Sequence, residues 1–285
     1  MLWTIASVLK WTTDFFQRKN LDSPKLDAEI LLAHVLGKNR VYLYSHFDEP
    51  LEKSELASYH ESIDRRANGE PVAYITGQKE FFTIPFRVES GVLIPRPETE
   101  ELVAIVTSRL KNRESIEILD LCTGSGCIAL SILKFLPNSK ATAIDLSDQA
   151  IKIANENSDC LNLQDRIEII KGDLFEPIDP EKKFDAIVSN PPYIPQKDLE
   201  NLPIDVRNFE PMLALDGGID GLDFYRKIAG ESKNFLAEDG FVAVEIGIDQ
   251  SKDVEEIFRR DGFNQIEIRK DLGGIDRVVI ARRDW

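Results

Sequence analysis

The chain has few of the residues that build cross-linked or metal-bound scaffolds, with three cysteines and three histidines among 285 residues. Cys122, Cys127 and Cys160 are odd in number and have no Cys-x-x-Cys spacing, which argues against a disulfide framework and against a zinc site. The histidines lie in three separate segments, without the pairing that metal ligation or a Ser-His-Asp arrangement needs. We therefore expect no metal site.

Positive charge and long apolar runs are also scarce. Lys and Arg number 35 against 50 Asp and Glu, which gives a net charge of -15. This balance disfavours nucleic acid as a partner, because a protein that grips nucleic acid must neutralise several phosphates with basic side chains. With 42% hydrophobic and 30% charged residues, the composition is that of an ordinary globular protein, and no membrane span is expected.

The amino-terminal segment predicts an amphipathic helix. Its apolar residues are mixed with Lys10, Thr12 and Asp14, and it has no small-residue cleavage site of the kind that ends an export signal. A cytoplasmic location is therefore expected, and the unpaired cysteines fit a reducing compartment.

Residues 1–75 show helical signals only. Ser23 and Pro24 suit the cap and first turn of a helix that ends at Gly37, and a further helix is predicted from Ser54 to Asn68. Apolar residues near the amino terminus also recur at helical spacing. These patterns predict a small helical bundle as a first domain.

The pattern changes between Val72 and Pro97 to short β-prone pieces, Glu80–Phe82 and Pro85–Val88, separated by glycine and proline. We interpret residues 76–97 as a β-hairpin linker between two domains.

Residues 98–285 alternate between apolar runs and helical stretches. Such alternation predicts an α/β fold with a mostly parallel, doubly wound Rossmann-like sheet. The two last runs, joined by a glycine-containing turn, predict a C-terminal antiparallel hairpin. The predicted strands are Ile116–Leu121, Ala141–Ile144, Ile167–Ile170, Phe184–Ser189, Phe241–Ile246, Gln265–Ile268 and Arg277–Ala281. The predicted helices include Gly126–Phe135, Asp148–Cys160 and Leu222–Phe235.

A glycine-rich motif follows the first of these strands and opens a helix. Glycines at such a turn let a ligand approach main-chain N–H groups at the helix amino terminus. Asp145, at the end of the next strand, is placed to accept hydrogen bonds from ribose hydroxyls. The motif alone fits S-adenosylmethionine, a dinucleotide or a structural turn. The residues expected to bind a cofactor here are Cys122, Thr123, Gly124, Ser125 and Gly126.

Asp173 and Leu174 follow the third predicted strand. Because ligands in such sheets bind at the carboxyl ends of the strands, Asp173 is expected to accept from an adenine amino group and Leu174 to pack on the ring. A turn followed by core residues is the alternative interpretation.

The most specific motif, Asn190-Pro191-Pro192-Tyr193, directly follows the fourth predicted strand. Its prolines hold a rigid loop with free carbonyls, Asn190 adds a side-chain oxygen and Tyr193 adds a flat face. The Asn190 oxygen and the Pro191 carbonyl are suited to accept both hydrogens of a planar NH₂ group. Asn190 also borders the expected cofactor pocket. The motif therefore predicts a clamp that aims a planar nitrogen at a methyl donor.

Together these motifs resemble methyltransferases that act on amide or exocyclic amino nitrogens, which include DNA adenine, ribosomal RNA guanine and release factor glutamine enzymes. Four further segments are similar to the last group, the bacterial release factor glutamine methyltransferases of the PrmC or HemK family. They are Leu93–Glu100, Phe209–Pro211, Leu213–Gly218 and Asp220–Leu222. The resemblance covers nearly the whole chain, including the small helical first domain.

The resemblance implies S-adenosylmethionine as cofactor, the glutamine of the Gly-Gly-Gln loop of class I release factors as acceptor, and substrate recognition by residues 1–75. It places Arg96 and Glu98 near the methionine end of the cofactor, while helix-start or surface roles for them, and the role of Glu245, stay open. One departure is Phe81-Phe82-Thr83, where the family usually has Phe-Tyr-Gly. The rivals are a nucleic-acid amino methyltransferase and a cofactor-binding scaffold without turnover.

Overall fold

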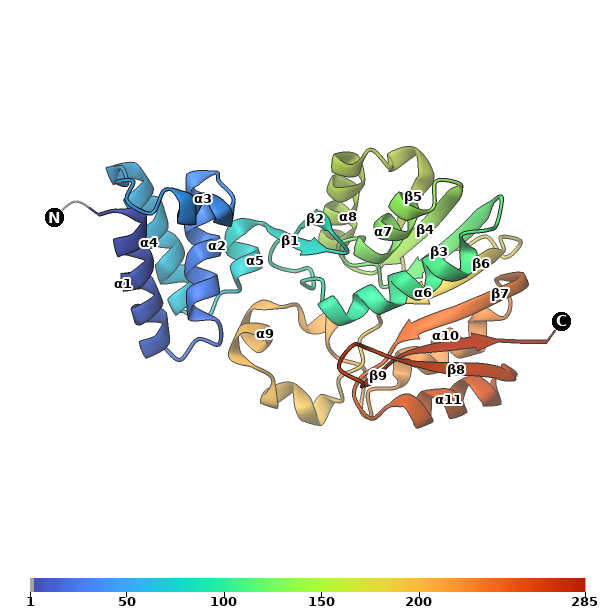
Figure 1. Ribbon diagram of the computed structural model, residues 1–285. Coiled ribbons are helices and arrows are strands. Elements are labelled where there is room, and N and C mark those ends of the chain that lie inside the picture. Colours follow the sequence, from blue (N-terminus) through green and yellow to red (C-terminus); the bar gives the residue numbers. More distant parts are fainter. Residues whose placement is uncertain (1–2, 285) are drawn as a thin grey trace. The chain divides into compact units, whose positions relative to one another are not determined.

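A computed structural model describes residues 3–284, which form two compact units (Figure 1). The first unit runs through Gln78 and also includes Pro203–Phe209. The predicted helices of this region are present, and the unit also contains three short helices, α3, α5 and α9. The helices are α1 (Ile5–Arg18), α2 (Pro24–Leu36), α3 (Arg40–Ser45), α4 (Lys53–Ala67), α5 (Val72–Thr76) and α9 (Ile204–Phe209).

Local signals fix the ends of these helices, and burial packs them together. Pro24 occupies the first turn of α2, which ends at Gly37 with a left-handed φ of 61°. Phe16, Leu31 and Leu32 are fully buried between the helices.

A buried ion pair and a late segment of chain complete the first unit. The Arg66 Nε atom of α4 donates to Asp27 Oδ2 of α2 at 2.7 Å. A Cβ atom at Gly69 would lie 3.5 Å from Phe209 and 3.7 Å from Ile204, so α9 packs against the chain just after α4. The unit is therefore built from two separate stretches of sequence.

The second unit contains a seven-stranded sheet with the strand order β5-β4-β3-β6-β7-β9-β8 (Figure 1). Strands β3 to β7 are parallel, and β9 is antiparallel to both β7 and β8. The predicted doubly wound sheet with a C-terminal antiparallel hairpin is confirmed. The strands are β3 (Ile116–Leu121), β4 (Ser139–Asp145), β5 (Ile167–Lys171), β6 (Phe184–Ser189), β7 (Leu236–Glu245), β8 (Gln265–Lys270) and β9 (Asp276–Arg282).

Helices cover both faces of the sheet because successive residues of each strand are buried on opposite sides. Ile118 belongs to the core cluster that contains α6 and α7, whereas Leu119 belongs to the cluster that contains α10 and α11. Helix α8 contacts α7, β4 and β5. The helices are α6 (Glu100–Leu110), α7 (Cys127–Phe135), α8 (Asp148–Leu161), α10 (Asp223–Ser232) and α11 (Ser251–Arg260).

A two-stranded hairpin, β1 (Gln78–Phe81) and β2 (Ile84–Arg87), precedes the sheet. Its turn residues Phe82 and Thr83 have φ angles of 49° and 65°. Phe81, Ile84 and Phe86 are buried in the same core cluster as α6 and α7. The hairpin is therefore anchored in the core of the second unit.

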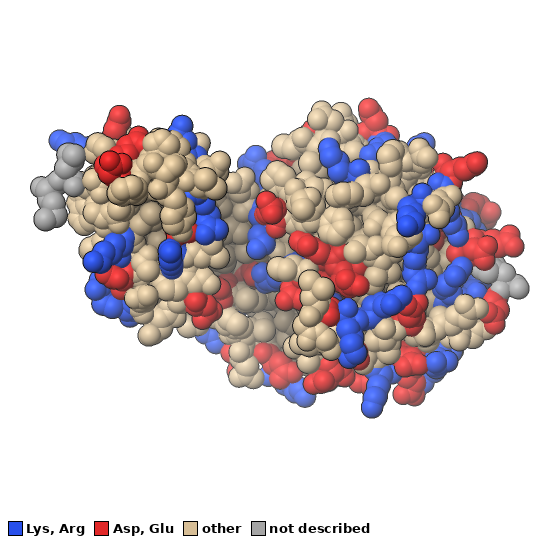
Figure 2. Space-filling view, viewed as in Figure 1, with Lys and Arg blue, Asp and Glu red and all other residues tan. Residues whose placement is uncertain are grey.

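The surface carries both signs of charge. Figure 2 shows Asp and Glu side chains interspersed with Lys and Arg over the visible face. Across residues 3–284, no helix is both long and apolar enough to cross a membrane.

Candidate active site

The carboxyl ends of β3, β4, β5 and β6 lie side by side in the sheet and open into one pocket. In this topology the chain reverses its direction of winding between β3 and β6, which is where open α/β sheets bind ligands. Most of the predicted site residues line this pocket. They are Cys122, Thr123, Gly124, Ser125, Asp145, Asp173, Leu174, Asn190 and Pro192.

Three predicted residues, Gly126, Pro191 and Tyr193, are outside the lining of this pocket in the described structure. Gly126 caps α7 with a φ of 80°, and a Cβ atom there would lie 3.0 Å from Leu130 and 3.3 Å from Ala154. Its missing side chain therefore lets the loop pack closely against helices behind the pocket.

Two aspartates hold the glycine-rich loop. Asp120 is fully buried and accepts hydrogen bonds from the Thr123 hydroxyl at 2.6 Å and from the Ala129 N–H at 3.2 Å. Burial raises the pKa of Asp120 to about 7. Asp145 accepts from the Gly124 N–H at 2.8 Å and the Ser147 N–H at 2.9 Å, and burial raises its pKa as well. Hydrogen bonds to Asp120 of β3 and to Asp145 of β4 thus fix the glycine-rich loop.

The Asp173 side of the pocket has a basic partner that the sequence did not reveal. Lys227 of α10 lines the pocket, and its ammonium group lies 3.2 Å from Asp173 Oδ2. Phe224, one helical turn earlier, also lines the pocket. Their positions in α10 were predicted only as part of a helix, because nothing in the local pattern indicates which helical face meets the pocket.

A second ion pair borders the pocket. Arg96 lines it, and the Arg96 guanidinium donates to the buried Glu210 at 2.5 Å. Glu210 also accepts from the Ile94 N–H at 3.2 Å, so it ties together two segments that were singled out by their family resemblance. Glu98 is outside the lining in the described structure. The role of either residue toward the cofactor stays a prediction.

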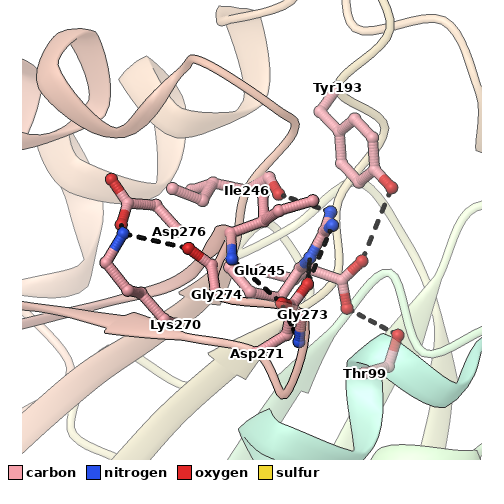
Figure 3. Close-up of polar contacts among 11 residues, drawn as sticks. Thr99, Tyr193, Glu245, Ile246, Lys270, Asp271, Gly273, Gly274 and Asp276 are labelled. Atoms are coloured by element: carbon pink, nitrogen blue, oxygen red, sulfur yellow. Dashed lines mark hydrogen bonds and ion pairs between the residues drawn. The ribbon is translucent and has the colours of Figure 1, made fainter.

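The clamp motif is connected to a buried carboxylate through Thr99, which the sequence analysis missed. The Asn190 amide nitrogen donates to Thr99 Oγ1 at 3.1 Å, and the Thr99 hydroxyl donates to Glu245 Oε2 at 2.5 Å. Figure 3 shows the Thr99 and Tyr193 hydroxyls directed at the two oxygens of Glu245, with Tyr193 at 3.5 Å. Burial raises the pKa of Glu245 to about 7. Thr99 itself lines the pocket.

The loop after the clamp is braced by the segment around Gly217. The Ile194 N–H donates to the Leu215 carbonyl and the Gly217 N–H donates to the Ile194 carbonyl, both at 3.0 Å. A Cβ atom at Gly217 would lie 2.7 Å from Tyr193 Cα, so only glycine permits this approach. The Gln250 amide adds a 2.9 Å hydrogen bond to the Tyr193 carbonyl. The clamp backbone is therefore held from both sides.

Among residues 3–284, no group of three or more His, Cys, Asp or Glu side chains is arranged to hold a metal ion. The Asp145 and Asp173 carboxylates that line the pocket can accept hydrogen bonds from hydroxyl or amino groups of a ligand.

Two family models match the chain. The PrmC N-terminal domain matches residues 7–77, and the methyltransferase small domain matches residues 99–204.

Curated relatives are similar over almost the full length. A release factor glutamine methyltransferase from Rhodopirellula baltica is 43% identical over 288 residues, which cover 99% of this chain and 97% of the relative. Another from Clostridium acetobutylicum is 44% identical over 278 residues, which cover 97% of this chain and 95% of that protein.

Solved structures share the fold at lower identity. A methyltransferase from Pyrococcus furiosus has a TM-score of 0.53 and 20% identity, covering 76% of this chain and 95% of its own. The Thermus thermophilus 16S rRNA N2 G1207 methyltransferase, in complex with AdoMet and guanosine, has a TM-score of 0.54 and 15% identity, covering 73% of this chain and 50% of its own.

Proposed function

Because this chain belongs to the release factor glutamine methyltransferase family, we propose that it methylates the side-chain amide nitrogen of the glutamine in the Gly-Gly-Gln motif of class I peptide chain release factors. The methyl donor is S-adenosylmethionine. In this proposal the protein acts in the cytoplasm, because its substrate takes part in translation there.

The pocket residues fit the methyl donor. Asp145 lies at the end of β4, where a carboxylate accepts from ribose hydroxyls, and Asp173 lies at the end of β5, within reach of an adenine amino group in this proposal. Main-chain N–H groups at the start of α7 and the apolar side chains of Ile128 and Leu174 complete the lining. The bound cofactor would supply an electrophilic methyl group on a sulfonium sulfur.

One observation carries the proposed reaction: the amide nitrogen of Asn190 is already engaged by Thr99. This leaves the Asn190 oxygen as the acceptor for a substrate NH₂ group. In the proposal the Pro191 carbonyl accepts the second hydrogen, so that the substrate nitrogen is held in one orientation beside the cofactor pocket.

Positioning is the main demand of this chemistry, because the lone pair of an amide nitrogen is delocalised into its carbonyl. Holding the nitrogen in line with the methyl carbon and the sulfur contributes up to about 7–11 kcal/mol through entropy and avoided solvent reorganisation. The two acceptors also stabilise the positive charge that develops on the nitrogen. The methylated amide is strongly acidic and loses its proton readily, so the step needs no dedicated base.

The test is a parallel incubation of the protein and labelled S-adenosylmethionine with an intact release factor, with DNA and with ribosomal RNA. We expect label only in the release factor, and mass spectrometry is expected to place one methyl group on the Gly-Gly-Gln glutamine. Label on a base would instead support a nucleic-acid amino methyltransferase. No label on any acceptor, despite cofactor binding, would support a scaffold without turnover.

A further inference from the structure

We infer that Thr99 and Glu245 are positioning residues that fix the orientation of the Asn190 amide, so that its oxygen, and not its nitrogen, faces the substrate. The inference rests on the proposed function, and it assigns roles to two side chains outside the four-residue clamp motif.

The residues form one continuous chain of hydrogen bonds. Asn190 Nδ2 lies 3.1 Å from Thr99 Oγ1, and Thr99 Oγ1 lies 2.5 Å from Glu245 Oε2. Thr99 is 2% exposed and Glu245 is 1% exposed, so solvent does not compete for these bonds. Of the three side chains, Asn190 and Thr99 line the pocket, while Glu245 lies behind them.

An asparagine amide needs such a partner, because a half-turn of its terminal group exchanges a donor for an acceptor at little steric cost. If the nitrogen of Asn190 faced the substrate, two NH₂ groups would oppose each other and the substrate would lose an acceptor. The carboxylate of Glu245 prevents this, since an ionised carboxylate only accepts hydrogen bonds. The Thr99 hydroxyl must then donate to Glu245, and its lone pairs are left to accept from the Asn190 nitrogen.

If Glu245 is protonated, the donor and acceptor roles along this series of hydrogen bonds reverse. The Glu245 carboxyl group then donates to Thr99, and the Thr99 hydroxyl turns to donate to the Asn190 oxygen. The amide nitrogen of Asn190 is left facing the substrate. Ionised Glu245 therefore corresponds to the competent clamp.

The surroundings of Glu245 place its ionisation near neutral pH. Burial raises its pKa to about 7, against the lowering effects of the Thr99 hydrogen bond, Arg277 and the Tyr193 hydrogen bond, while Glu98 raises it. Tyr225 of α10 donates its hydroxyl to the Glu245 main-chain carbonyl at 3.0 Å. The titratable or charged groups that face Glu245 are Glu98, Cys127, Tyr193, Tyr225 and Arg277.

The first experiment compares the pH dependence of kcat for the full-length protein and its Glu245→Gln variant, with intact release factor as substrate. A carboxyl group that titrates near pH 7 gives the unmodified protein a rise in kcat of up to about tenfold between pH 6 and pH 8. The variant keeps the shape of the side chain but cannot ionise, and its amide can donate to Thr99. We expect its kcat to fall on the order of tenfold to a hundredfold and this pH-dependent rise to vanish.

The second experiment removes the Thr99 hydroxyl, which is the middle group of this series of hydrogen bonds. Thr99→Val deletes the hydroxyl at nearly constant shape and is expected to lower kcat by a similar factor, with the KM for S-adenosylmethionine changed less than about twofold. Thr99→Ser keeps the hydroxyl and is expected to restore most of the turnover. Thr107→Val is the matched control, because the Thr107 hydroxyl donates to carbonyls of its own helix, α6, and the kcat of this variant is expected to stay unchanged.

Two results would overturn the inference. One is a pH dependence of kcat in Glu245→Gln that matches that of the unmodified protein, and the other is equal kcat in Thr99→Val and Thr99→Ser. If Glu245→Gln fails to fold, as judged by its melting temperature, the threonine pair decides alone. Failure of the proposed function is distinguishable, because the unmodified protein would then not methylate release factor at any pH.

Discussion

At the scale of single residues, hydrogen bonds within the protein fix the orientation of a polar group that lines the pocket. The Asp145 carboxylate already accepts the Gly124 N–H at 2.8 Å and the Ser147 N–H at 2.9 Å, so its orientation is fixed. Each carboxylate oxygen retains a lone pair for a further donor. Little side-chain entropy is therefore lost when a ribose hydroxyl binds there.

Replacement of this carboxylate tests its proposed role. We expect Asp145→Ala to weaken S-adenosylmethionine binding by roughly 1.5–3 kcal/mol, which is about a 10- to 150-fold rise in Kd, because charge-assisted hydrogen bonds are lost. Titration calorimetry measures the change. Asp148→Ala is the control, since Asp148 is an exposed carboxylate in the same region and pairs with Lys171, so its Kd is expected to match that of the unmodified protein. Tight binding of NAD to the unmodified protein would contradict the cofactor assignment.

Substitution of the clamp asparagine, Asn190, is expected to affect turnover much more than cofactor binding. Asn190→Ala is expected to lose most turnover, because the missing oxygen no longer orients the substrate nitrogen. Its melting temperature is expected to change little, since Asn190 is only half-buried, and its affinity for S-adenosylmethionine is expected to fall modestly at most. Single-turnover kinetics with release factor, together with calorimetry for the cofactor, checks both parts. Normal turnover in this variant would contradict the clamp.

At the scale of elements, the β1–β2 turn contains two non-glycine residues with left-handed backbone conformations, Phe82 and Thr83. Thr83 has a φ of 65°, at the position where the family usually has glycine, and its side chain is exposed. The neighbouring Phe82 ring packs edge-on against Phe135, with 5.0 Å between centroids. Phe82 therefore supplies an aromatic ring without the hydroxyl of the family's usual tyrosine, while Thr83 bears the cost of a left-handed backbone.

Thr83→Gly is accordingly expected to stabilise the protein. Relief of the left-handed strain, less the added flexibility of glycine in the unfolded chain, amounts to about 0.5–1 kcal/mol, or a rise in Tm of about 1–3 °C. Thr107→Gly is the matched control, because the same substitution inside α6 is expected to lower the Tm. Differential scanning calorimetry of both variants decides the point, and a fall in Tm for Thr83→Gly would show that the turn is not strained.

How much the sequence could predict at this scale depends on the range of the interactions involved. Strands β3 and β6 have the predicted limits, because a buried parallel strand is a short apolar run with clear ends. Strand β7 begins at Leu236, earlier than predicted, since Glu238 and Asp239 extend it with polar residues that the apolar pattern does not include. The six-residue helix α3 was missed because so short a helix leaves hardly two turns of periodicity.

The site was predictable as far as its residues lie in local motifs. Each strand-end residue follows a recognisable apolar run, and the topology then brings these ends together. Thr99 and Glu245 are 146 residues apart, and no local pattern indicates that their side chains meet. The addition of Pro203–Phe209 to the first unit is another contact between distant segments.

At the scale of the whole molecule, one pocket that recognises an amide cannot separate one glutamine from the many others in a cell. A second surface must contribute, and the first unit carries exposed apolar side chains suited to protein contact. Val41, Tyr44 and Phe47 recur at three-residue spacing along α3 and the turn after it, and they are 73%, 57% and 59% exposed. The three-residue spacing places Val41 and Tyr44 on one side of α3, and Phe47 follows in the turn after the helix. The family resemblance implies substrate recognition by the first domain, and we expect these residues to contact a release factor surface remote from its Gly-Gly-Gln loop.

The corresponding prediction compares two substrates and two surface variants. An intact release factor is expected to have a much higher kcat/KM than a Gly-Gly-Gln peptide, because only the factor engages both surfaces. Val41→Asp is expected to raise the KM for the intact factor severalfold, since a buried interface charge without a partner is costly, and to leave the peptide kinetics unchanged. Leu272→Asp is the control, because Leu272 is also an exposed apolar residue and lies in the β8–β9 turn, outside the first unit. Equal effects of Val41→Asp on both substrates would mean that α3 acts on the fold and not on docking.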